Sequence, residues 1–543
     1  MFAWSIGLKH RPMFDAPDAS GPIEERVMPP IRILLAEDNA DHQQLLLRAL
    51  AKSGAAPEVV LAASGDRLLE LARTESFDCV VIDYNLPPYT APELIELLEG
   101  AAPEAPRVVI SASEDQRIVI ASMRTGVADF VRKDEAITGT NLWDRVERAI
   151  EVARAAQQDR RETNRRLVSL QKQAETDALT GLGNRAYLDR VLAPDPQELD
   201  RRRKDRRRAT GIVMLDVDHF KRVNDTWGHA AGDDVLREIA RLVRQAVSPS
   251  DTAIRWGGEE FVVLRQSATI AETWGWADDL RLAIGLAVGV GSPAKPVTVS
   301  MGVDVVPTAE LCHDSIARAD QALYLAKQSG RDRVCTWGMV CAMDAARASC
   351  TEPLSATVSA RERLLEVVDR LTPTLGPVQR DHVGDHGLRV RSVASGVADF
   401  LGMDREAIED LELAAEFHDI GKVGVPEEVL AAPRKLTAGE RRLVAEHARF
   451  GADLLRACGA SEAAAEAVAT HHDRFRFLQR STPTPGSVIC ACDALVTMMS
   501  SRPYAPKRRP DQAIIELIER RGSQFHPAVV DTITASEYHY LAA

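Results

Sequence analysis

The sequence predicts a multidomain protein: two successive α/β domains, a helical coiled-coil linker between them, and an all-α domain at the C-terminal end. Its 543 residues exceed one domain several-fold, at roughly 150 residues per domain. Short apolar runs alternate with helical patterns twice along the chain, which is typical of α/β sheets. The last third of the chain shows helical patterns throughout. Because 45% of the residues are apolar and 27% are charged, a folded globular state is expected.

The charge balance excludes some classes of partner. The formal net charge is −13, from 67 Lys and Arg against 80 Asp and Glu, which argues against nucleic acid and anionic membranes as partners. The chain has no run of about 18 apolar residues that would span a membrane. Residues 1–30 hold five prolines and no basic start, and they predict a disordered leader instead of a signal peptide. Eight scattered cysteines predict reduced thiols, so a soluble cytoplasmic protein is expected.

The first α/β domain is expected at residues 31–150. Its strand-like runs lie at 31–35, 59–61, 79–82, 108–110 and 130–131. Glu37 and Asp38 follow the first run, Asp83 the third, Ser111 the fourth and Lys133 the fifth. In a parallel sheet these strand ends meet at one edge, where three carboxylates would hold Mg²⁺. A carboxylate at such a site can attack a phosphoryl group and become an aspartyl phosphate.

These residues resemble the receiver domain of two-component response regulators, which has a flavodoxin-like fold. The matching motifs are the Glu37-Asp38 pair, VVIDYNLPP around Asp83, VVISAS at Ser111 and ADFVRKD at Lys133, with Phe130 at the aromatic switch position. The usual Lys-Pro step is Lys-Asp here. The resemblance implies a Mg²⁺-dependent receiver that a cognate histidine kinase phosphorylates on Asp83.

A polar stretch without Gly or Pro follows, and we assign residues 151–176 to a coiled-coil signalling helix. Apolar positions recur at alternating steps of three and four, which predicts a parallel coiled coil and a homodimer. These positions are Leu142, Val146, Ala149, Ala153, Ala156, Leu167, Leu170 and Ala174. The alternative is a solvated connecting helix.

The second α/β domain is expected at residues 177–340, with strand-like runs at 211–215, 261–264 and 297–303. In RWGGEEFVVL the Gly-Gly pair predicts a tight hairpin turn that presents Glu259 and Glu260 at an exposed tip. Asp216 and Asp218 end a strand, and carboxylates facing such a hairpin can clamp a triphosphate through two cations. The basic run at 201–208 is expected to be a solvated loop.

This segment resembles the GGDEF diguanylate cyclases, which have a mixed sheet covered by helices, over residues 177–334. The motifs are DALTGLGNR, DVDHFKRVND, GHAAGDDVL, GGEEF and YLAKQSGRDRV. The resemblance implies that two GTP are condensed to cyclic di-GMP by a dimer. It implies that Asp216 and Glu260 bind Mg²⁺ and that Glu259 activates the 3′-hydroxyl. It also implies that Asn224 and Asp233 recognise guanine and that Lys327 and Arg331 contact phosphate. Further substrate contacts are implied for Phe220 and Lys221. The alternative is a degenerate domain that only senses GTP.

One departure concerns product inhibition. The family's RxxD motif ends six residues before the hairpin glycines, where this chain has Asp251, but its Arg position is Ser248. A serine cannot make the bidentate contact of an arginine, so we expect weak or no product inhibition here.

The third domain is expected at residues 361–543, after a linker at 341–360. It holds eight of the chain's thirteen histidines: His382, His386, His418, His447, His471, His472, His526 and His539. Imidazoles and carboxylates on several helices suit a pair of transition metals that activates a hydroxide.

This segment resembles HD hydrolases, most closely the HD-GYP cyclic-di-GMP phosphodiesterases. The motifs are HDIGKVGVPEEVL, DHGLRV, the His471-His472 pair and CDALVTMMSSRPY. The resemblance implies a pair of Fe, Mn or Zn ions on His386, His418, Asp419, His447, His471, His472 and Asp493, and it places Lys422 near the scissile phosphate. His382 stands where some members have a metal-holding Glu. The Gly-Tyr-Pro loop is missing from residues 473–487, so the hydrolysed substrate stays open, and a regulatory metal domain without turnover is the alternative.

The sequence thus predicts a phosphorylation-regulated diguanylate cyclase with a C-terminal HD-type metal domain that hydrolyses cyclic di-GMP or a related phosphoester. Two alternatives remain: a cyclic-di-GMP phosphodiesterase with a GTP-sensing GGDEF domain, and a non-catalytic signalling scaffold.

Overall fold

The computed structural model describes residues 30–51, 57–101, 104–112, 126–138, 141–193, 209–266, 268–291, 295–351, 358–475, 481–500 and 508–535. The predicted leader, apart from Pro30, and the basic run at 201–208 lie outside these ranges. The chain forms two compact units, Met1–Leu170 and Gln171–Ala543. Within the described ranges, no helix combines the length and apolarity that a membrane span requires. All eight cysteines are free thiols.

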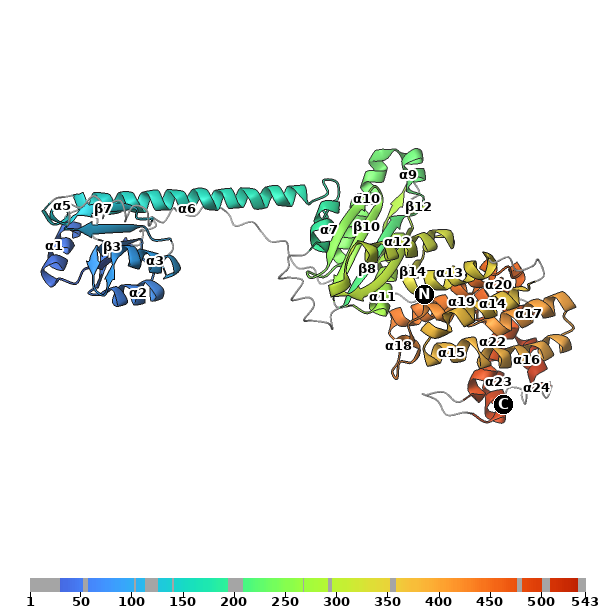
Figure 1. Cartoon of the computed structure of the whole chain (residues 1–543). Coiled ribbons are helices and arrows are strands. Elements are labelled where there is room, and N and C mark those ends of the chain that lie inside the picture. Colours follow the sequence, from blue (N-terminus) through green and yellow to red (C-terminus); the bar gives the residue numbers. More distant parts are fainter. Residues whose placement is uncertain are drawn as a thin grey trace. The chain divides into compact units, whose positions relative to one another are not determined.

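The first unit is a doubly wound α/β domain (Figure 1). Its elements are β1 (Arg32–Ala36), α1 (Ala40–Ala51), β2 (Glu58–Ala62), α2 (Gly65–Thr74), β3 (Cys79–Asp83), β4 (Asn85–Leu86), β5 (Tyr89–Thr90), α3 (Ala91–Ala101), β6 (Arg107–Ser111), β7 (Asp129–Arg132), α5 (Lys133–Thr138) and α6 (Asn141–Ala174). The main sheet has the order β2-β1-β3-β6-β7, and all its strands are parallel. This is the flavodoxin-like order, whose ligand site lies at the carboxyl ends of β1 and β3.

Two apolar cores cover the faces of this sheet, because side chains alternate along each strand. Leu34 and Ile82 belong to the core under α2 and α3. Ile33 and Val81 belong to the other core, which includes residues of α1, α5 and α6.

Helix α6 divides the predicted coiled-coil seam into two parts. Leu142, Val146 and Ala149 are buried in the core of the first domain, so these three positions stabilise that domain and are not available to a partner helix. Farther along the same helix, Leu167 and Leu170 are more than half exposed. The seam that could pair with a second copy is therefore confined to the later turns of α6.

The second domain has a mixed five-stranded sheet in the order β14-β13-β8-β10-β9. Its elements are α7 (Arg185–Leu192), β8 (Ala209–Val217), α9 (Phe220–Trp227), α10 (His229–Ala246), β9 (Thr252–Gly257), β10 (Glu260–Gln266), α11 (Ile270–Ala287), β11 (Gly289–Val290), β12 (Lys295–Pro296), β13 (Val299–Pro307), η1 (Thr308–Glu310), α12 (His313–Gln328) and β14 (Val334–Thr336). β8 pairs antiparallel with β10 and β13, and β13 pairs parallel with β14. The predicted strands are confirmed, and the hairpin of β9 and β10 turns at Gly258-Glu259, directly after Gly257 ends β9.

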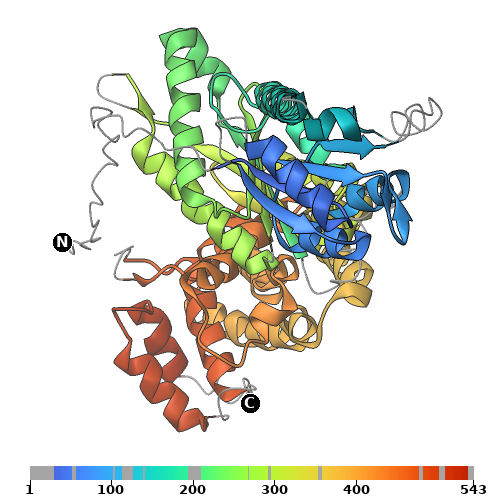
Figure 2. The ribbon, with the colours of Figure 1, turned by 90° about the vertical axis from the view of Figure 1, so that its left-hand side faces the viewer.

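The third domain consists of helices, drawn in yellow to red (Figure 2). They are α13 (Trp337–Thr351), α14 (Ala360–Leu371), η2 (Thr372–Thr374), α15 (Pro377–Val383), α16 (Asp385–Phe400), α17 (Arg405–Phe417), η3 (Ile420–Gly424), α18 (Glu427–Leu430), α19 (Ala438–Ala457), α20 (Glu462–Thr470), α22 (Pro485–Met499), α23 (Pro510–Glu519) and α24 (Pro527–Ala535).

The second and third domains share one continuous apolar core. Helix α13 connects the apolar cores of the two domains. Its residues Met339 and Ala346 are completely buried, and Met339 packs against Gly424 of the third domain. The sequence predicts a linker at 341–360, but residues 341–351 are helical and contribute to this core. The segment is a packed helix instead of a solvent-exposed linker because the apolar face of α13 is buried against the third domain.

Candidate active sites and metal centre

The predicted residues of the first domain meet at the carboxyl edge of its sheet. Glu37 follows β1, Asp83 ends β3, and Lys133 begins α5 after β7, which brings Lys133 Nζ to 2.8 Å from Glu37 Oε2 and 3.1 Å from Asp83 Oδ2. Oxygens of Glu37, Asp38 and Asp83 lie within 4.8 Å of one another. Ser111 is buried at the end of β6, as expected.

The electrostatics of this edge favour a cation. Burial raises the pKa of Asp83, and the neighbouring charge of Glu37 raises it further, while Lys133 opposes both. Burial alone would lower the pKa of Lys133, but its bonds to Glu37 and Asp83 raise it. A hard divalent ion on the three carboxylates would relieve the remaining repulsion, so the residues present fit Mg²⁺.

In the second domain, Asp216 and Glu260 are direct cross-strand neighbours on β8 and β10. Lys327 from α12 reaches the same point, with its Nζ 2.8 Å from Asp216 Oδ2. Burial raises the pKa of both carboxyl groups, and each is raised further by neighbouring carboxylates. An acidic pair that is costly to ionise without a cation fits the Mg²⁺ site expected from the sequence.

Asp218, two residues beyond Asp216, has a structural role. It is buried and accepts hydrogen bonds from Thr298 Oγ1 at 2.8 Å, Ser300 Oγ at 2.7 Å and the Asp332 backbone N–H at 3.1 Å. These three bonds tie the end of β8 to the start of β13 and to the segment after α12. The paired carboxylates of the DVD motif therefore divide into one site residue and one structural residue.

The Gly-Gly hairpin is held from one side. Gly258 adopts a left-handed φ of 49°, and the Arg255 guanidinium donates to its carbonyl at 2.7 Å and also pairs with Asp177. The glycines are exposed, but Glu259 and Glu260 are half-buried, so the expectation that both carboxylates stand at an exposed tip is wrong. The pairing of β10 with β8 draws Glu260 toward the sheet, whereas Glu259 lies in the turn that precedes β10.

The remaining predicted residues of this domain lie on its helices. Asn224 of α9 packs against Gly232 of α10: a Cβ on Gly232 would lie 2.0 Å from Asn224 Oδ1. Asp233, the next residue, is half exposed. Phe220 is buried in the apolar core, whereas Lys221 is exposed.

Arg331 is half-buried and adopts a left-handed φ of 63°, directly after Gly330. Its backbone N–H donates to the Ala326 carbonyl at 3.0 Å. Lys327 and Arg331 therefore do not share a helical face as their spacing predicts, because α12 ends at Gln328.

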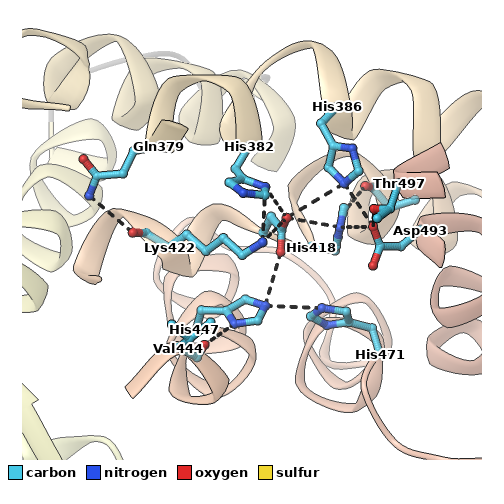
Figure 3. Close-up of polar contacts among 12 residues, drawn as sticks. Gln379, His382, His386, His418, Lys422, Val444, His447, His471, Asp493 and Thr497 are labelled. Carbon is cyan, nitrogen blue, oxygen red and sulfur yellow. Dashed lines mark hydrogen bonds and ion pairs between the residues drawn. The ribbon is translucent and has the colours of Figure 1, made fainter. Parts of the chain in front are cut away.

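The predicted metal ligands of the third domain converge in one cluster (Figure 3). Four overlapping groups have ligand atoms within 4.8 Å of one another: His447, His471 and His472; His382, His386 and Asp419; His386, His418 and Asp493; and His418, Asp419 and His471. The ligands come from α15, α16, α19 and α22, and from the ends of α17 and α20.

Three histidines are oriented in the same way. His418, His447 and His471 each place Nδ1 against the backbone carbonyl three residues earlier, those of Ala415, Val444 and Val468. A proton on Nδ1 leaves Nε2 as a lone pair aimed into the cluster. His418 Nε2 is completely buried and has no hydrogen-bond partner among the described residues. An inward-facing nitrogen without a partner fits a bound metal ion.

Asp419 is the centre of the cluster. Its carboxylate lies 2.8 Å from His382 Nδ1, 3.2 Å from His447 Nε2 and 2.7 Å from Lys422 Nζ. Although burial opposes it, the charges of Lys422 and His418 hold the pKa of Asp419 well below its usual range. Burial has the opposite effect on His471, because it disfavours the charged imidazole and lowers the pKa of His471 well below its usual range. Burial would lower the pKa of His418, but the neighbouring Asp419 and Asp493 carboxylates raise it. The cluster thus presents ionised carboxylates that favour a positive charge at His418, which a bound metal ion would supply in place of the proton.

Asp493 completes the cluster on the side of α22. Its Oδ1 lies 3.0 Å from His386 Nε2 and accepts a hydrogen bond at 3.0 Å from Thr497 Oγ1. Thr497 is a site residue that the sequence analysis missed. It lies one helical turn after Asp493, and this spacing of four is the signal that could have identified it.

Comparison with known proteins agrees with this order of sites. Residues 33–145 match the family of response regulator receiver domains, residues 174–333 the family described as diguanylate cyclase, GGDEF domain, and residues 356–529 an HD domain family. Diguanylate cyclase DgcP of Pseudomonas aeruginosa is 36% identical over 218 residues, which cover 40% of this chain and 31% of DgcP. Response regulator PleD of Caulobacter vibrioides is 28% identical over 309 residues, which cover 56% of this chain and 65% of PleD.

This chain therefore spans less than two thirds of the length of either relative. Among solved structures, the GGDEF domain of DgcB from Caulobacter crescentus, in complex with c-di-GMP, is 33% identical. The match covers 30% of this chain and 96% of that domain, with a TM-score of 0.27. Three successive segments of the chain thus match the family models of response regulator receiver domains, GGDEF domains and HD domains, in that order.

Proposed function

We propose that this protein is a phosphorylation-regulated diguanylate cyclase that condenses two GTP into cyclic di-GMP. The observation that carries the proposal is the convergence of Asp216, Glu260 and Lys327 at one point of the sheet. Asp216 and Glu260 would hold Mg²⁺, which when bound would neutralise charge on the triphosphate. Lys327 and Arg331 would bind phosphate oxygens, and Asn224 and Asp233 would hold the guanine edge.

The reaction needs two GTP molecules in opposed sites. The 3′-oxygen of one GTP bonds to the α-phosphorus of the other, and the bond from that phosphorus to the β-phosphate oxygen breaks to release pyrophosphate. Glu259 would accept the 3′-hydroxyl proton. Two such transfers close the ring and release two pyrophosphates. Because one domain holds one GTP, the working unit would be a dimer, with the exposed later turns of α6 as the pairing surface.

Control would come from Asp83. A histidine kinase would transfer its phosphoryl group to the Asp83 carboxylate, with Lys133 placed to pair with the added charge. Phosphorylation would change how two first domains pair and so bring the cyclase halves into register.

The test is to incubate the full chain with GTP and Mg²⁺, with and without an acyl-phosphate mimic, and to measure cyclic di-GMP and pyrophosphate. We expect two pyrophosphates per product and no product from Glu260→Gln. Glu310→Gln is the matched control, because Glu310 is exposed and lies far along the sheet from the site. It follows the end of β13 that pairs with the start of β8, whereas Asp216 lies near the other end of β8. Product from Glu260→Gln at the wild-type rate would refute the site assignment.

A second candidate function rests on the histidine cluster of the third domain. The buried, inward-facing His418 Nε2 beside Asp419 supports a dinuclear metal centre of Fe, Mn or Zn, and Lys422 is placed to bind a phosphoester. A metal-dependent phosphohydrolase acting on cyclic di-GMP or a related phosphoester is the activity this centre would support.

This second candidate is tested by incubating cyclic di-GMP with the Mn²⁺-loaded protein. Linear product that disappears in His418→Ala would support hydrolysis. Hydrolysis without any synthesis from GTP would favour a phosphodiesterase with a GTP-sensing domain. Absence of both activities would favour a signalling scaffold.

A further inference from the structure

The segment between α12 and β14 is held in an unusual backbone conformation. Gly330, Arg331 and Asp332 have φ values of 97°, 63° and 45°, and a left-handed conformation is uncommon for residues other than glycine. Such a segment persists only where its surroundings hold it in place. Asp332 supplies two of these restraints: its N–H donates to Asp218 at 3.1 Å, and its carboxylate pairs with Arg281 at 2.7 Å.

The next residue, Arg333, connects this segment to the third domain. Its side chain is 2% exposed, and its guanidinium donates to the Ser329 carbonyl at 2.9 Å. It also pairs with Asp453 at 2.7 Å and with Glu446 at 2.5 Å, both on α19. One buried side chain therefore joins the end of α12, which carries Lys327, to α19 of the third domain.

The partner helix carries a ligand of the histidine cluster. Glu446 directly precedes His447, whose Nε2 lies 3.2 Å from Asp419 Oδ1 and 3.4 Å from His471 Nε2. A shift of Glu446 along or around α19 would move His447 by a similar amount, since the two belong to the same helical turn. Metal affinity depends steeply on how ligands are oriented by their neighbours.

A second ion pair joins α19 to another helix of the second domain, α11. Arg442 of α19 pairs with Asp278 of α11 at 2.6 Å, and Asp278 also pairs with Arg281, which holds Asp332. Close by, a Cβ on Gly439 would lie 3.1 Å from the Gly275 Cα, so the helices touch through their backbones. The contact leaves little room for independent movement of α11 and α19.

From these contacts we propose that Arg333 is a positioning residue shared by two sites: nucleotide bound at Lys327 and Arg331 changes the metal affinity of the histidine cluster through Arg333, Glu446 and His447. The inference rests on the proposed nucleotide site of the second domain. By linkage, metal in the cluster changes nucleotide affinity by the same factor.

The experiment measures Co²⁺ binding to the full chain by its visible absorption, in excess Mg²⁺ to occupy the oxygen-ligand sites. Titrations are made with and without saturating α,β-methylene-GTP, whose α-phosphorus cannot release pyrophosphate. His418→Ala supplies the background for the histidine-bound signal. We expect the Co²⁺ dissociation constant to change by about fivefold or more when nucleotide is bound, the size typical of coupled sites.

The variants Arg333→Lys and Glu446→Gln are expected to bind both ligands, while the ratio of the Co²⁺ dissociation constants without and with nucleotide falls to one. A lysine offers its protons from a single nitrogen and lacks the fork by which the guanidinium reaches Asp453 and Glu446, and a glutamine lacks the charge. Glu446→Gln decides the outcome if Arg333→Lys does not fold. Arg434→Gln is the control: it breaks an ion pair to Glu440 on α19 without touching Arg333 and should keep the wild-type ratio.

Two results would overturn the inference alone: a ratio of one in the wild type with both ligands bound, or an unchanged ratio in the Arg333 and Glu446 variants. Failure of the wild type to bind the nucleotide at all would overturn the proposed nucleotide site, and the coupling with it.

Discussion

Lys327 Nζ lies 2.8 Å from Asp216 Oδ2, so the ammonium group of α12 is the charge that balances the buried carboxylate at the end of β8. Burial raises the pKa of Asp216, and the bond to Lys327 works against that rise. In the nucleotide-bound state, phosphate oxygens and a cation would compete for the same two groups. The Asp216–Lys327 ion pair therefore joins the two groups to which a cation and phosphate oxygens would bind in the proposed nucleotide-bound state.

Removing Lys327 should weaken catalysis and shift its pH dependence. In Lys327→Met the pKa of Asp216 rises, because the group that lowers it is gone, and the acidic limb of the rate profile moves to higher pH. The loss of a phosphate contact should also lower kcat by about 100-fold. Initial rates of cyclic-di-GMP formation across pH measure both effects. Lys295→Met, at an exposed position of β12, should match the wild type, and an unmoved acidic limb in Lys327→Met would contradict the assignment.

Thr497 should matter for metal affinity without being a ligand. Its hydroxyl orients Asp493 at 3.0 Å, and loss of such a contact typically weakens metal binding by about 10-fold or more. We expect Thr497→Val to weaken Co²⁺ binding by that amount, His418→Ala to abolish histidine-bound Co²⁺ absorption, and Thr497→Ser to restore binding. Metal content after gel filtration is the measurement, with the exposed Asp399→Asn as control. Unchanged affinity in Thr497→Val would rule out this role.

The proposed cyclase activity should show little inhibition by its product. Asp251 already has two hydrogen-bond partners, because it accepts the N–H of Ser248 in its own turn and the N–H of Gln266 at the end of β10, each at 3.0 Å. With serine at 248, no guanidinium faces a bound product there. Saturating cyclic di-GMP should leave the initial rate of the wild type nearly unchanged, and Ser248→Arg should introduce inhibition that Ser248→Gln does not. Strong inhibition of the wild type would show that product binds through other residues.

The second and third domains should unfold together. Met339 is completely buried between them, so Met339→Ala should lower the free energy of unfolding by about 2–5 kcal/mol. With Trp143 of the first domain replaced by Phe in both proteins, tryptophan fluorescence mainly reports the second domain, through Trp227, Trp256, Trp274 and Trp276, and bound Co²⁺ reports the third. Both signals should shift to lower denaturant concentration by the same amount. Leu286→Ala, at an 89% exposed position, should change little, and separate transitions in the wild type would contradict the shared core.

Much of the first two domains follows from local patterns. Parallel strands end at one edge, so Glu37, Asp83 and Lys133 could be placed together from their positions after apolar runs alone. The distinction between Asp216 and Asp218 could not be made in this way. Asp216 lies near the end of β8 and Asp218 directly follows it, and only contacts with Thr298 and Ser300, about 80 residues away, give Asp218 its structural role.

The histidine cluster was predicted by composition and resemblance, but the orientation of its rings comes from backbone carbonyls three residues earlier, at helix ends for His418 and His471 and within α19 for His447. His418 and His471 follow the last residues of α17 and α20, where a carbonyl three residues earlier is available to accept Nδ1–H. Arg333 lies within the YLAKQSGRDRV motif, but nothing in the sequence indicated its partners. Its partners Glu446 and Asp453 lie more than a hundred residues away, and a pairing of that range depends on how the two domains pack.

Glu440 should make stability depend on pH. The Glu440 carboxylate pairs with Arg434 at 2.7 Å and accepts the Thr437 N–H at the first turn of α19. These two interactions lower the pKa of Glu440 to about 2. Because the folded pKa lies below the usual value of about 4.5, this stabilisation is fully present above pH 4.5. It is lost as the pH falls toward 2. At pH 7, Glu440→Gln should lower the free energy of unfolding by about 1–2 kcal/mol, the size of a lost helix cap with a surface ion pair.

Denaturant unfolding of wild type and Glu440→Gln, measured from pH 7 down to pH 3, checks the sign. The free energies of unfolding of the two proteins should converge below pH 4.5. Below this pH the carboxyl group of the unfolded wild type takes up a proton more readily than that of the folded protein, so the stabilisation by Glu440 is lost. Glu409→Gln serves as the control, since Glu409 pairs with Arg405 in solvent, where such pairs add little. A constant difference between wild type and Glu440→Gln across the whole range would mean that the glutamate acts through packing and not through its charge.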